Sequence, residues 1–227
     1  MAMPGRRAWA VAAMLAPLSV VPVAVDAADA RPKAQSTWTF RALLDSRPIG
    51  EHRFSIAAGQ DAAEYTLISE AAFAVRMLGV TVYRYRHRAV ERWRGDCLVA
   101  LSSETDDDGQ RSSVNAEQQG ETFRVVTPAA QTARGCVMSF AYWNPALRGQ
   151  HRLINAQTGR IEAVTVTPVE DGSVGPGDRA QPARGWRISG PGRPIVVWYS
   201  AQGDWVGLDT TVDGGRQLSY RRHEGAP

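Results

Sequence analysis

Residues 81–94 read TVYRYRHRAVERWR, and the two-residue alternation in this stretch decides the fold class. One set of alternate positions carries aromatic, apolar and two ionisable side chains: Tyr83, Tyr85, His87, Ala89, Glu91 and Trp93. The other set is basic, interrupted only by Val90: Arg84, Arg86, Arg88, Arg92 and Arg94. Because successive side chains of a strand point to opposite faces, the stretch predicts a β-strand with an aromatic face and a basic face.

The segments around this stretch continue the alternation and are separated by turns. Residues 37–44 place Trp38 and Phe40 on one face, and His52 to Ile56 return after a turn in which Pro48 restricts φ and Gly50 permits positive φ. These residues predict a β-hairpin. Further strands are expected at residues 65–75, 97–105, 111–119, 121–127, 159–167, 186–189, 195–200, 205–212 and 217–222.

Three segments need a separate interpretation. Residues 111–119 are polar on both faces, which indicates an edge strand or a solvent-exposed strand. Residues 169–185 are rich in Gly, Pro and charge without periodicity, and are interpreted as a long surface loop. Asn144 can cap, and Pro145 can begin, a short helix over residues 144–150.

Many short strands and no long helical pattern predict an all-β protein. We expect an antiparallel meander that forms a curved sheet, a sandwich or a partly open barrel. The sequence shows no internal repeat and no domain boundary, so residues 36–223 are expected to form one β domain, after a mobile lead-in over residues 28–35.

The N-terminus has the order of a secretory signal peptide. Residues 1–7 carry two arginines and no acid, residues 8–25 are apolar and uncharged, and small residues follow. We expect a signal peptide over residues 1–27, cleaved after residue 27 or 30, and a periplasmic mature protein. A retained transmembrane anchor is the alternative, since the apolar run approaches spanning length; Pro17 and Pro22 favour cleavage. No second apolar span follows, so none is expected after cleavage.

Charge and cysteine content limit the partners and the compartment. The formal charge is +3, and it becomes +2 without residues 1–27, with 24 basic and 22 acidic side chains. This near balance gives no indication of a nucleic-acid partner. Two cysteines in an exported chain predict one disulfide, between Cys97 and Cys136, and two separate buried thiols are the alternative.

Aromatic side chains on the inner strand faces can line an apolar pocket, which curved sheets of this size can enclose. The candidate lining residues are Trp38, Phe40, Tyr83, Tyr85, His87, Glu91, Trp93, Phe140, Tyr142 and Trp143. A solid aromatic core is the alternative. His87 and Glu91 share one face, about 13 Å apart at strand rise, and can form a site; hydrogen-bonded polar groups in the core are the alternative.

The row of five arginines named above can form an anion-binding surface for a phosphate or a lipid head group. A solubilising outer face, or pairing with a neighbouring acidic strand, is the alternative. The sequence contains no recognisable catalytic or metal-binding constellation, because the four histidines are scattered and Asp106, Asp107 and Asp108 are consecutive rather than alternate. We expect no cofactor, no metal and no enzymatic activity.

Several segments together resemble domain-of-unknown-function family 6134, a set of exported bacterial proteins. They are residues 48–54, 91–98, 136–145 with the letters CVMSFAYWNP, 153–159, 198–199 and 205–208. The likeness spans residues 36–222. The resemblance implies a periplasmic β-rich protein and implies no catalytic residues.

Three functional hypotheses follow from these patterns. The first is a non-catalytic periplasmic binding or carrier module for an apolar or lipid-like ligand, which the inward aromatic residues favour. The second is a structural or interaction protein of the cell envelope with a solid core and a protein partner. The third is an enzyme with a site at His87 and Glu91.

Overall fold

The structure is a computed structural model that describes residues 36–59, 61, 63–175 and 180–223. The expected signal peptide over residues 1–27 and the lead-in over residues 28–35 lie outside the described residues. Among the described residues, no helix is long and apolar enough to cross a membrane.

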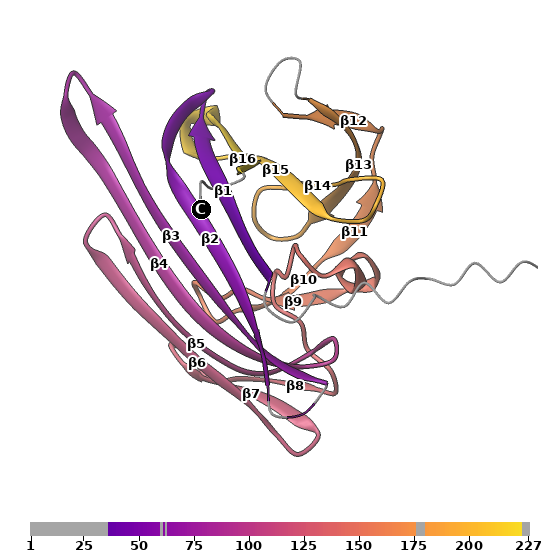
Figure 1. Ribbon diagram of the computed structural model, residues 1–227. Coiled ribbons are helices and arrows are strands. Elements are labelled where there is room, and N and C mark those ends of the chain that lie inside the picture. Colours follow the sequence, from indigo (N-terminus) through magenta and orange to yellow (C-terminus); the bar gives the residue numbers. More distant parts are fainter. Residues whose placement is uncertain (1–35, 60, 62, 176–179, 224–227) are drawn as a thin grey trace, which may run out of the picture.

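The described chain is built from antiparallel strands and two short 3₁₀ helices (Figure 1). The strands are β1 (Ser36–Leu44), β2 (Arg47–Ala58), β3 (Glu64–Met77), β4 (Val80–Arg94), β5 (Cys97–Asp107), β6 (Gln110–Gln119), β7 (Thr122–Thr127), β8 (Gln131–Arg134), β9 (Arg152–Ile154), β10 (Ile161–Ala163), β11 (Thr165–Pro168), β12 (Gly172–Val174), β13 (Gln181–Ser189), β14 (Ile195–Tyr199), β15 (Trp205–Thr211) and β16 (Gln217–His223). The helices are η1 (Pro145–Gly149) and η3 (Asp213–Gly215). The all-β prediction is confirmed, and so is a short helix near residues 144–150.

One large sheet runs in the order β11-β13-β14-β15-β16-β1-β2-β3-β4-β5-β6-β7-β8, and β12 pairs with β13. The strands at the two ends of this order, β11 and β8, do not pair with each other, so the sheet is open rather than a closed barrel. The first and last strands in sequence, β1 and β16, are neighbours in the middle of this sheet, for example with Ala42 opposite Tyr220. Figure 1 shows the sheet curling so that β1–β8 and β11–β16 face each other across the interior.

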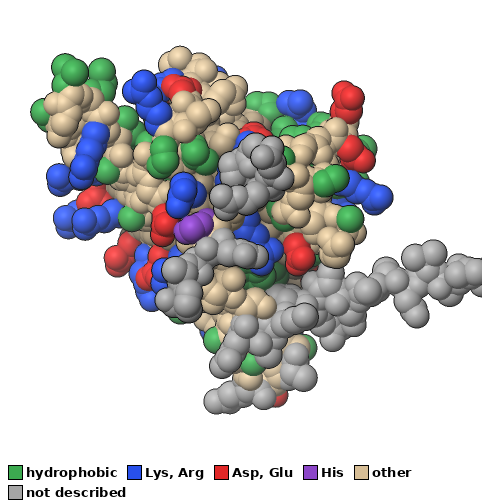
Figure 2. All heavy atoms as spheres, turned by 45° about the horizontal axis from the view of Figure 1, so that its top comes forward, with side chains coloured by type: hydrophobic (Ala, Val, Ile, Leu, Met, Phe, Trp, Pro, Cys, Tyr) green, Lys and Arg blue, Asp and Glu red, His purple; other side chains and the backbone are tan. Residues whose placement is uncertain are grey.

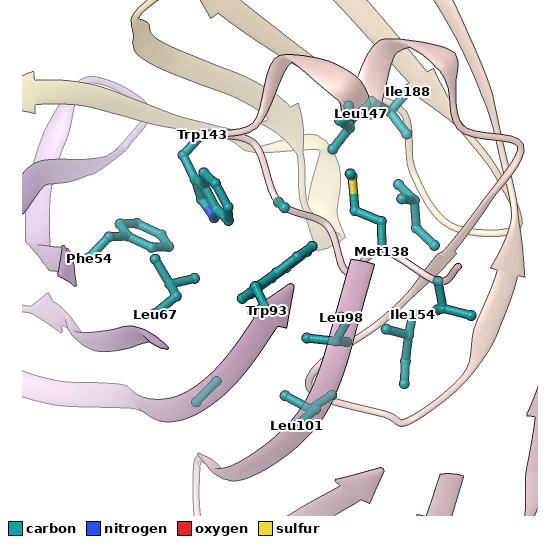
Figure 3. Close-up of a cluster of buried hydrophobic side chains, with 14 of the residues drawn as sticks. Phe54, Leu67, Trp93, Leu98, Leu101, Met138, Trp143, Leu147, Ile154 and Ile188 are labelled. Atoms are coloured by element: carbon teal, nitrogen blue, oxygen red, sulfur yellow. The ribbon is translucent and has the colours of Figure 1, made fainter. Parts of the chain in front are cut away.

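Residues 136–164 lie on the concave side of the sheet, and we call them the cover segment (Figure 1). They contain η1 and the small β9–β10 hairpin. Val137, Met138, Leu147, Leu153 and Ile154 of this segment are at most 1% exposed and belong to the same hydrophobic core as the sheet. Figure 3 shows Met138, Leu147 and Ile154 packed with Trp93, Leu98 and Leu101 of β4 and β5. The cover segment therefore supplies the side of the hydrophobic core that faces the concave surface of the sheet.

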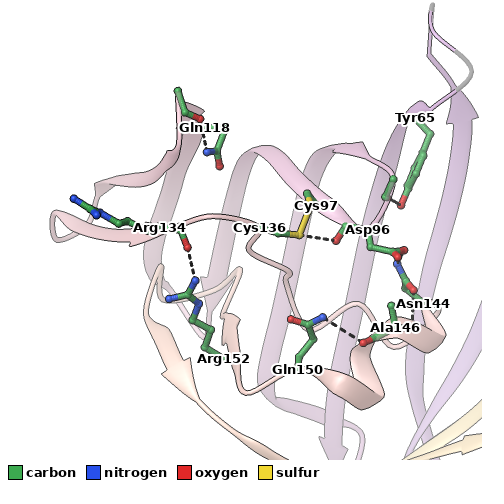
Figure 4. Close-up of a disulfide and its surroundings, with 12 residues drawn as sticks. Tyr65, Asp96, Cys97, Gln118, Arg134, Cys136, Asn144, Ala146, Gln150 and Arg152 are labelled. Atoms are coloured by element: carbon green, nitrogen blue, oxygen red, sulfur yellow. Dashed lines mark hydrogen bonds between the residues drawn. A yellow bond between two sulfur atoms is a disulfide. The ribbon is translucent and has the colours of Figure 1, made fainter.

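A disulfide between Cys97 and Cys136 joins the start of β5 to the start of the cover segment (Figure 4). The backbone N–H of Leu98 donates to the carbonyl of Val137 at 2.8 Å, beside the disulfide. At the other end of the same stretch, Asn144 donates from Nδ2 to Asp96 Oδ1 at 2.9 Å and accepts from the backbone N–H of Ala146 as the cap of η1. The predicted disulfide is present, and it fixes where the cover segment enters the interior.

Of the two alternatives for residues 111–119, the structure shows the solvent-exposed strand and not the edge strand. This segment forms β6, which lies between β5 and β7 and is not an edge strand. Its inner face carries Val114 and Ala116, both buried. The cover segment lies across this part of the sheet, and Ser112 donates a hydrogen bond to the carbonyl of Gln157. The polar side chains of this strand are mostly exposed, and only Val114 and Ala116 are buried under the cover segment.

The prediction of a long loop over residues 169–185 is wrong for its described ends. Residues 172–174 form β12 and residues 181–185 form the first half of β13, in which residues 181–183 pair with β12. Val174, Ala183 and Val206 make a small separate cluster of buried residues. Val174 and Ala183 are isolated among Gly, Pro and charged residues, so the sequence shows no alternation there. It therefore does not predict that β12 and β13 pair.

Two further strands differ from the sequence prediction. The expected strand over residues 159–167 divides into β10, which pairs with β9, and β11, which pairs with β13 at the end of the large sheet. The alternation does not predict β8, which extends the large sheet by pairing with β7. Both differences concern segments of three or four residues, for which alternation is too short to be informative.

Candidate functional site

A pocket of about 270 Å³ lies between the concave face of β2–β4 and the cover segment. Its third side comes from the end of β13, the start of β14 and the turn between them. The lining residues are His52, Phe54, Leu67, Ser69, His87, Ala89, Glu91, Ser139, Phe140, Ala141, Tyr142, Trp143, Asn155, Ala156, Gln157, Glu162, Val164, Ile188, Gly190, Gly192, Arg193 and Ile195.

The register between β3 and β4 explains why a space exists at this place. Inward-facing pairs at the two ends of the hairpin are aromatic: Phe73 opposite Tyr85, and Tyr65 opposite Trp93. The pairs between them are smaller: Ala71 opposite His87, Ser69 opposite Ala89, and Leu67 opposite Glu91. These pairs are smaller than the aromatic pairs on either side, most of all Ser69 with Ala89, and they leave a depression in the sheet. The cover segment spans this depression and does not fill it.

Two histidines of the pocket each pair with a hydroxyl group on a neighbouring strand. His52 Nε2 lies 2.7 Å from Ser69 Oγ, and His87 Nδ1 lies 2.9 Å from Thr105 Oγ1. Burial disfavours the charged ring, and it lowers the pKa of His52 to about 3 and the pKa of His87 to about 4. Both rings are therefore neutral at pH 7.

Glu91 is the most buried ionisable group of the pocket, with 4% of its surface exposed. Its Oε2 atom accepts hydrogen bonds from Trp93 Nε1 at 3.0 Å and from Ser139 Oγ at 3.1 Å. Burial raises the pKa of Glu91 to about 7, although both hydrogen bonds act in the opposite direction. The carboxyl group is therefore held on the pocket floor with a substantial neutral fraction at physiological pH.

Two buried side-chain nitrogens of the described residues have no hydrogen-bond partner, and both belong to pocket residues. They are His52 Nδ1 and Trp143 Nε1. Trp143 is 7% exposed, and its ring packs edge-on against Trp93 at 5.3 Å between ring centroids. Figure 3 shows the nitrogen-bearing edge of Trp143 directed toward the side of Phe54 and Leu67, which also line the pocket. The pocket wall thus presents an unpaired N–H donor.

The structure brings half of the predicted lining residues together. His87, Glu91, Phe140, Tyr142 and Trp143 line the pocket. Trp38, Phe40, Tyr83, Tyr85 and Trp93 do not. Phe40 is fully buried and packs on Trp205 at 3.9 Å between centroids, Tyr85 stacks on Phe73, and Trp93 lies behind Trp143 in the core. Trp38 is half-buried near the start of β1, and Tyr83 donates to Asp107 near the far end of β4.

Sequence reasoning missed His52, Ser69 and the turn at residues 190–193. The alternation of residues 52–56 does point His52 inward, with Phe54 and Ile56, and this signal could have added it to the set. Ser69 carries no signal of its own, because its importance comes from being a small residue opposite Ala89. The turn reaches the pocket from a distant part of the chain, which no local pattern indicates.

The arginine row lies on the outer face of β4, and acidic residues neutralise part of it. Arg88 pairs with Glu70 at 3.2 Å, and Arg94 pairs with Glu64 at 2.6 Å. Both acids lie on β3, as the alternative of a neighbouring acidic strand predicted. Arg84, Arg86 and Arg92 are exposed on the same face. An anion-binding role of this surface stays a prediction.

His87 is held by Thr105, and Glu91 is held by Trp93 and Ser139, so each ionisable group has its own structural partner. In the described part of the chain, no group of three or more His, Cys, Asp or Glu side chains is placed to hold a metal ion. An open, curled antiparallel sheet with a covered inner pocket defines the class: an all-β protein with a barrel-like sheet.

The family pattern of "Domain of unknown function (DUF6134)" matches residues 40–223, and the chain belongs to this family. This confirms the resemblance found in the sequence. No curated protein matches the chain.

Among solved structures, the chain is similar to a β-barrel-like protein of domain of unknown function DUF1849 from Brucella abortus. The TM-score is 0.57 at 13% sequence identity, over 84% of this chain and 96% of that chain. At this identity the likeness concerns the fold alone.

Proposed function

We propose that this protein is an exported, non-catalytic binding or carrier protein that holds an apolar or lipid-like ligand in the inner pocket. One observation carries the proposal: the chain places a cover segment over the depression in the curved sheet and leaves about 270 Å³ between them. This volume is just below the range of sites for drug-sized molecules, so the ligand is small or a single medium-length chain.

The lining supports an apolar body for this ligand. Phe54, Leu67, Val164, Ile188 and Ile195 contribute aliphatic and aromatic surface. Burying such surface is favourable by about 25 cal/mol per Å² of apolar area removed from water. On the inner wall, the ionisable groups are two neutral histidines and Glu91, a carboxyl group of raised pKa, and such a wall suits an uncharged apolar body.

Export and a periplasmic location are supported by the residues rather than by the fold. The N-terminal order of basic, apolar and small residues is typical of a signal peptide. The disulfide between Cys97 and Cys136 suits an oxidising compartment. Cell fractionation tests this part: the full chain should appear in an osmotic-shock fraction, and a chain lacking residues 2–27 should stay in the cytoplasm. Retention of both chains in the cytoplasm would contradict export.

Binding is tested with the chain from residue 28 and a series of ten-carbon probes, using displacement of the fluorescent dye N-phenyl-1-naphthylamine. The wild-type protein should release the dye in a saturable, single-site manner. Ala89→Leu fills the floor of the pocket and should weaken probe binding by tenfold or more. Ala72→Leu is the matched control, because Ala72 lies on the neighbouring strand with its side chain exposed. Absence of binding to the wild-type protein, or equal binding to all three chains, would refute the proposed function.

A further inference from the structure

The unpaired nitrogens of the pocket indicate the polar chemistry of the ligand, and this inference rests on the proposed function. Trp143 Nε1 can only donate a hydrogen bond, and it is buried without an acceptor. His52 Nδ1 is buried without a partner as well, while Nε2 of the same ring contacts Ser69. Buried polar groups of native proteins are almost always paired, with protein or with ordered water. Two exceptions in one pocket indicate that a bound molecule completes them.

The charged groups around the pocket decide against an anionic ligand. Glu91 and Glu162 are carboxyl groups that line it. Arg193 also lines it, but Arg193 lies 3.4 Å from Asp213 in an exposed ion pair. The two histidines are neutral, so no buried cation is available to balance a carboxylate or a phosphate. An anionic head group placed beside Glu91 would lose its hydration without gaining a counter-charge.

We propose that the inner pocket binds an uncharged amphiphile, such as an alcohol, ketone or ester on a hydrocarbon chain, whose oxygen accepts a hydrogen bond from Trp143 Nε1–H. The hydrocarbon part contacts Phe54, Leu67 and Ile188. A ligand oxygen that accepts from this N–H satisfies a donor that is otherwise buried without a partner, whereas a plain hydrocarbon leaves the donor unpaired. The site therefore discriminates against plain hydrocarbons.

The test uses Trp143→Phe, which keeps an aromatic ring and removes the N–H. Decan-2-one, decanol, decane and decanoate at pH 8 are compared by dye displacement on the wild-type protein and on the variant. The affinity for decan-2-one and decanol should fall on the order of tenfold in the variant, while the affinity for decane stays the same. Trp38→Phe is the control, because Trp38 lies outside the pocket, and it should change none of the four affinities.

The outcomes separate the inference from the proposed function. If the wild-type protein binds decan-2-one and decane, and Trp143→Phe weakens both equally or neither, the ligand class is wrong and the proposed function stands. Binding of decanoate at pH 8 as tightly as decan-2-one would overturn the exclusion of anionic ligands. Thermal unfolding of Trp143→Phe shows whether a loss of affinity comes from misfolding. The melting temperature of the variant should be at least that of the wild-type protein, because the substitution removes an unpaired buried donor.

A second inference comes from a different place, the end of the β3–β4 hairpin. Pairing of β3 with β2 ends at Phe73, and pairing of β4 with β5 begins at Tyr85. Residues 74–83 therefore form backbone pairs only within the hairpin, and Figure 1 shows its tip standing clear of β2 and β5. Among the described residues, five large hydrophobic side chains are exposed, and four of them lie on this tip: Met77, Leu78, Val80 and Val82. The fifth, Val126, is on β7.

Basic residues accompany this apolar tip. Arg76 and Arg84 are exposed on its two strands. Figure 2 shows hydrophobic side chains gathered at this end of the molecule, upper left, with Lys or Arg side chains next to them. Asp107 and Asp108 lie near the base of the tip, where Asp108 accepts from the backbone N–H of Arg84. The two arginines and the two aspartates balance in charge, and Arg76 is the charged residue nearest the end of the tip.

We infer that the hairpin tip inserts into the surface of a lipid bilayer. A stable protein interface needs about 800 Å² on each partner, and a protruding two-stranded tip offers too narrow a surface for that. A bilayer needs only a few apolar side chains at the acyl boundary and basic side chains at the level of the head groups. The tip has apolar side chains at its end, among them Leu78 and Val80, and Arg76 lies next to them on β3. This inference does not depend on the inner pocket.

Vesicle flotation tests the insertion. The wild-type chain from residue 28 should float with vesicles of three parts phosphatidylcholine and one part phosphatidylglycerol, and Leu78→Ser with Val80→Ser should lower the bound fraction several-fold. Val126→Ser is the matched control and should bind as the wild-type protein does. Equal flotation of all three chains would overturn the inference. So would sedimentation showing a dimer that the double variant dissociates, because the tip would then bind a second copy.

Discussion

The hydroxyl group of Ser139 donates a hydrogen bond to Glu91 Oε2 at 3.1 Å, although 48 residues separate the two in sequence. The same oxygen accepts from Trp93 Nε1 at 3.0 Å. One carboxyl group thus joins the floor of the pocket to the cover segment above it. Because this group is buried and its pKa is raised to about 7, its ionisation affects both the stability of the fold and the attachment of the cover.

Glu91→Gln should change how stability depends on pH. The pKa of Glu91 is about 7 in the folded protein, against 4.5 in an unfolded chain, so the folded state holds the proton more tightly. The stability that this provides is present below pH 4.5 and is lost as the pH rises toward 7. The amide that replaces the carboxyl group in the variant stays neutral throughout. The free energy of unfolding of the variant, relative to the wild-type protein, should therefore rise by about 2–3 kcal/mol between pH 5 and pH 8.

Urea titrations at several pH values measure this difference. Glu70→Gln is the control, because Glu70 is exposed and pairs with Arg88 on the outer face. Its effect should be small and nearly independent of pH. A constant difference between Glu91→Gln and the wild-type protein across this range would show that Glu91 ionises normally in the folded state.

His87→Gln should change how the free energy of unfolding depends on pH below pH 6.5. The pKa of His87 falls from 6.5 in an unfolded chain to about 4 in the folded protein, because burial disfavours the charged ring. The unfolded state therefore takes up a proton first, and stability is lost as the pH falls from 6.5 to 4, by about 3 kcal/mol from this group. The variant should lose stability less steeply over this interval in urea titrations. His151→Gln, at an exposed position, should leave the slope unchanged; a slope unchanged in both variants would count against a neutral His87.

The outline of the fold could be predicted from the sequence, but only five of the 22 residues that line the pocket could. The alternation of residues 81–94 correctly separates the buried side chains of β4 from its exposed arginines. The pocket depends on register, since Ser69 becomes part of the floor only because β3 pairs it with Ala89. It depends also on the route of the cover segment, whose aromatic residues look alike in sequence whether they fill the interior or only span it. The register of β3 with β4 and the path of the cover segment depend on contacts between residues far apart in sequence, which local patterns do not predict.

Removal of the disulfide should destabilise the protein without abolishing its strands. The bond joins residues 39 positions apart, and closing a loop of this length stabilises the fold by about 4 kcal/mol on the chain-entropy account. We expect the Cys97→Ser, Cys136→Ser double variant to lose about that amount in urea titrations, with the far-ultraviolet circular dichroism of a β protein retained. The wild-type protein with a reductant should behave like the double variant. A loss below about 1 kcal/mol would mean that the cover segment is held in place by its core contacts and not by the disulfide.

Gly159→Ala should loosen the part of the cover segment that borders the pocket. Gly159 has φ +69°, and a Cβ there would lie 3.0 Å from Pro128 Cδ, 3.1 Å from the Thr127 carbonyl oxygen and 3.3 Å from a Val114 methyl group. Left-handed backbone costs an L-residue about 1–2 kcal/mol, and the contacts add to this, so the variant should be destabilised by about 2 kcal/mol or more.

Gly149→Ala is the matched control for this substitution. Gly149 lies in η1 of the same cover segment, and a Cβ there meets no atom within 4 Å. Its free energy of unfolding should stay close to that of the wild-type protein. Residues 155–157 line the pocket and lie just before Gly159, so Gly159→Ala should also weaken displacement of the dye by decan-2-one, whereas Gly149→Ala should not. Equal stability of the two variants would show that the loop at residues 155–159 can adopt another conformation without disturbing the pocket.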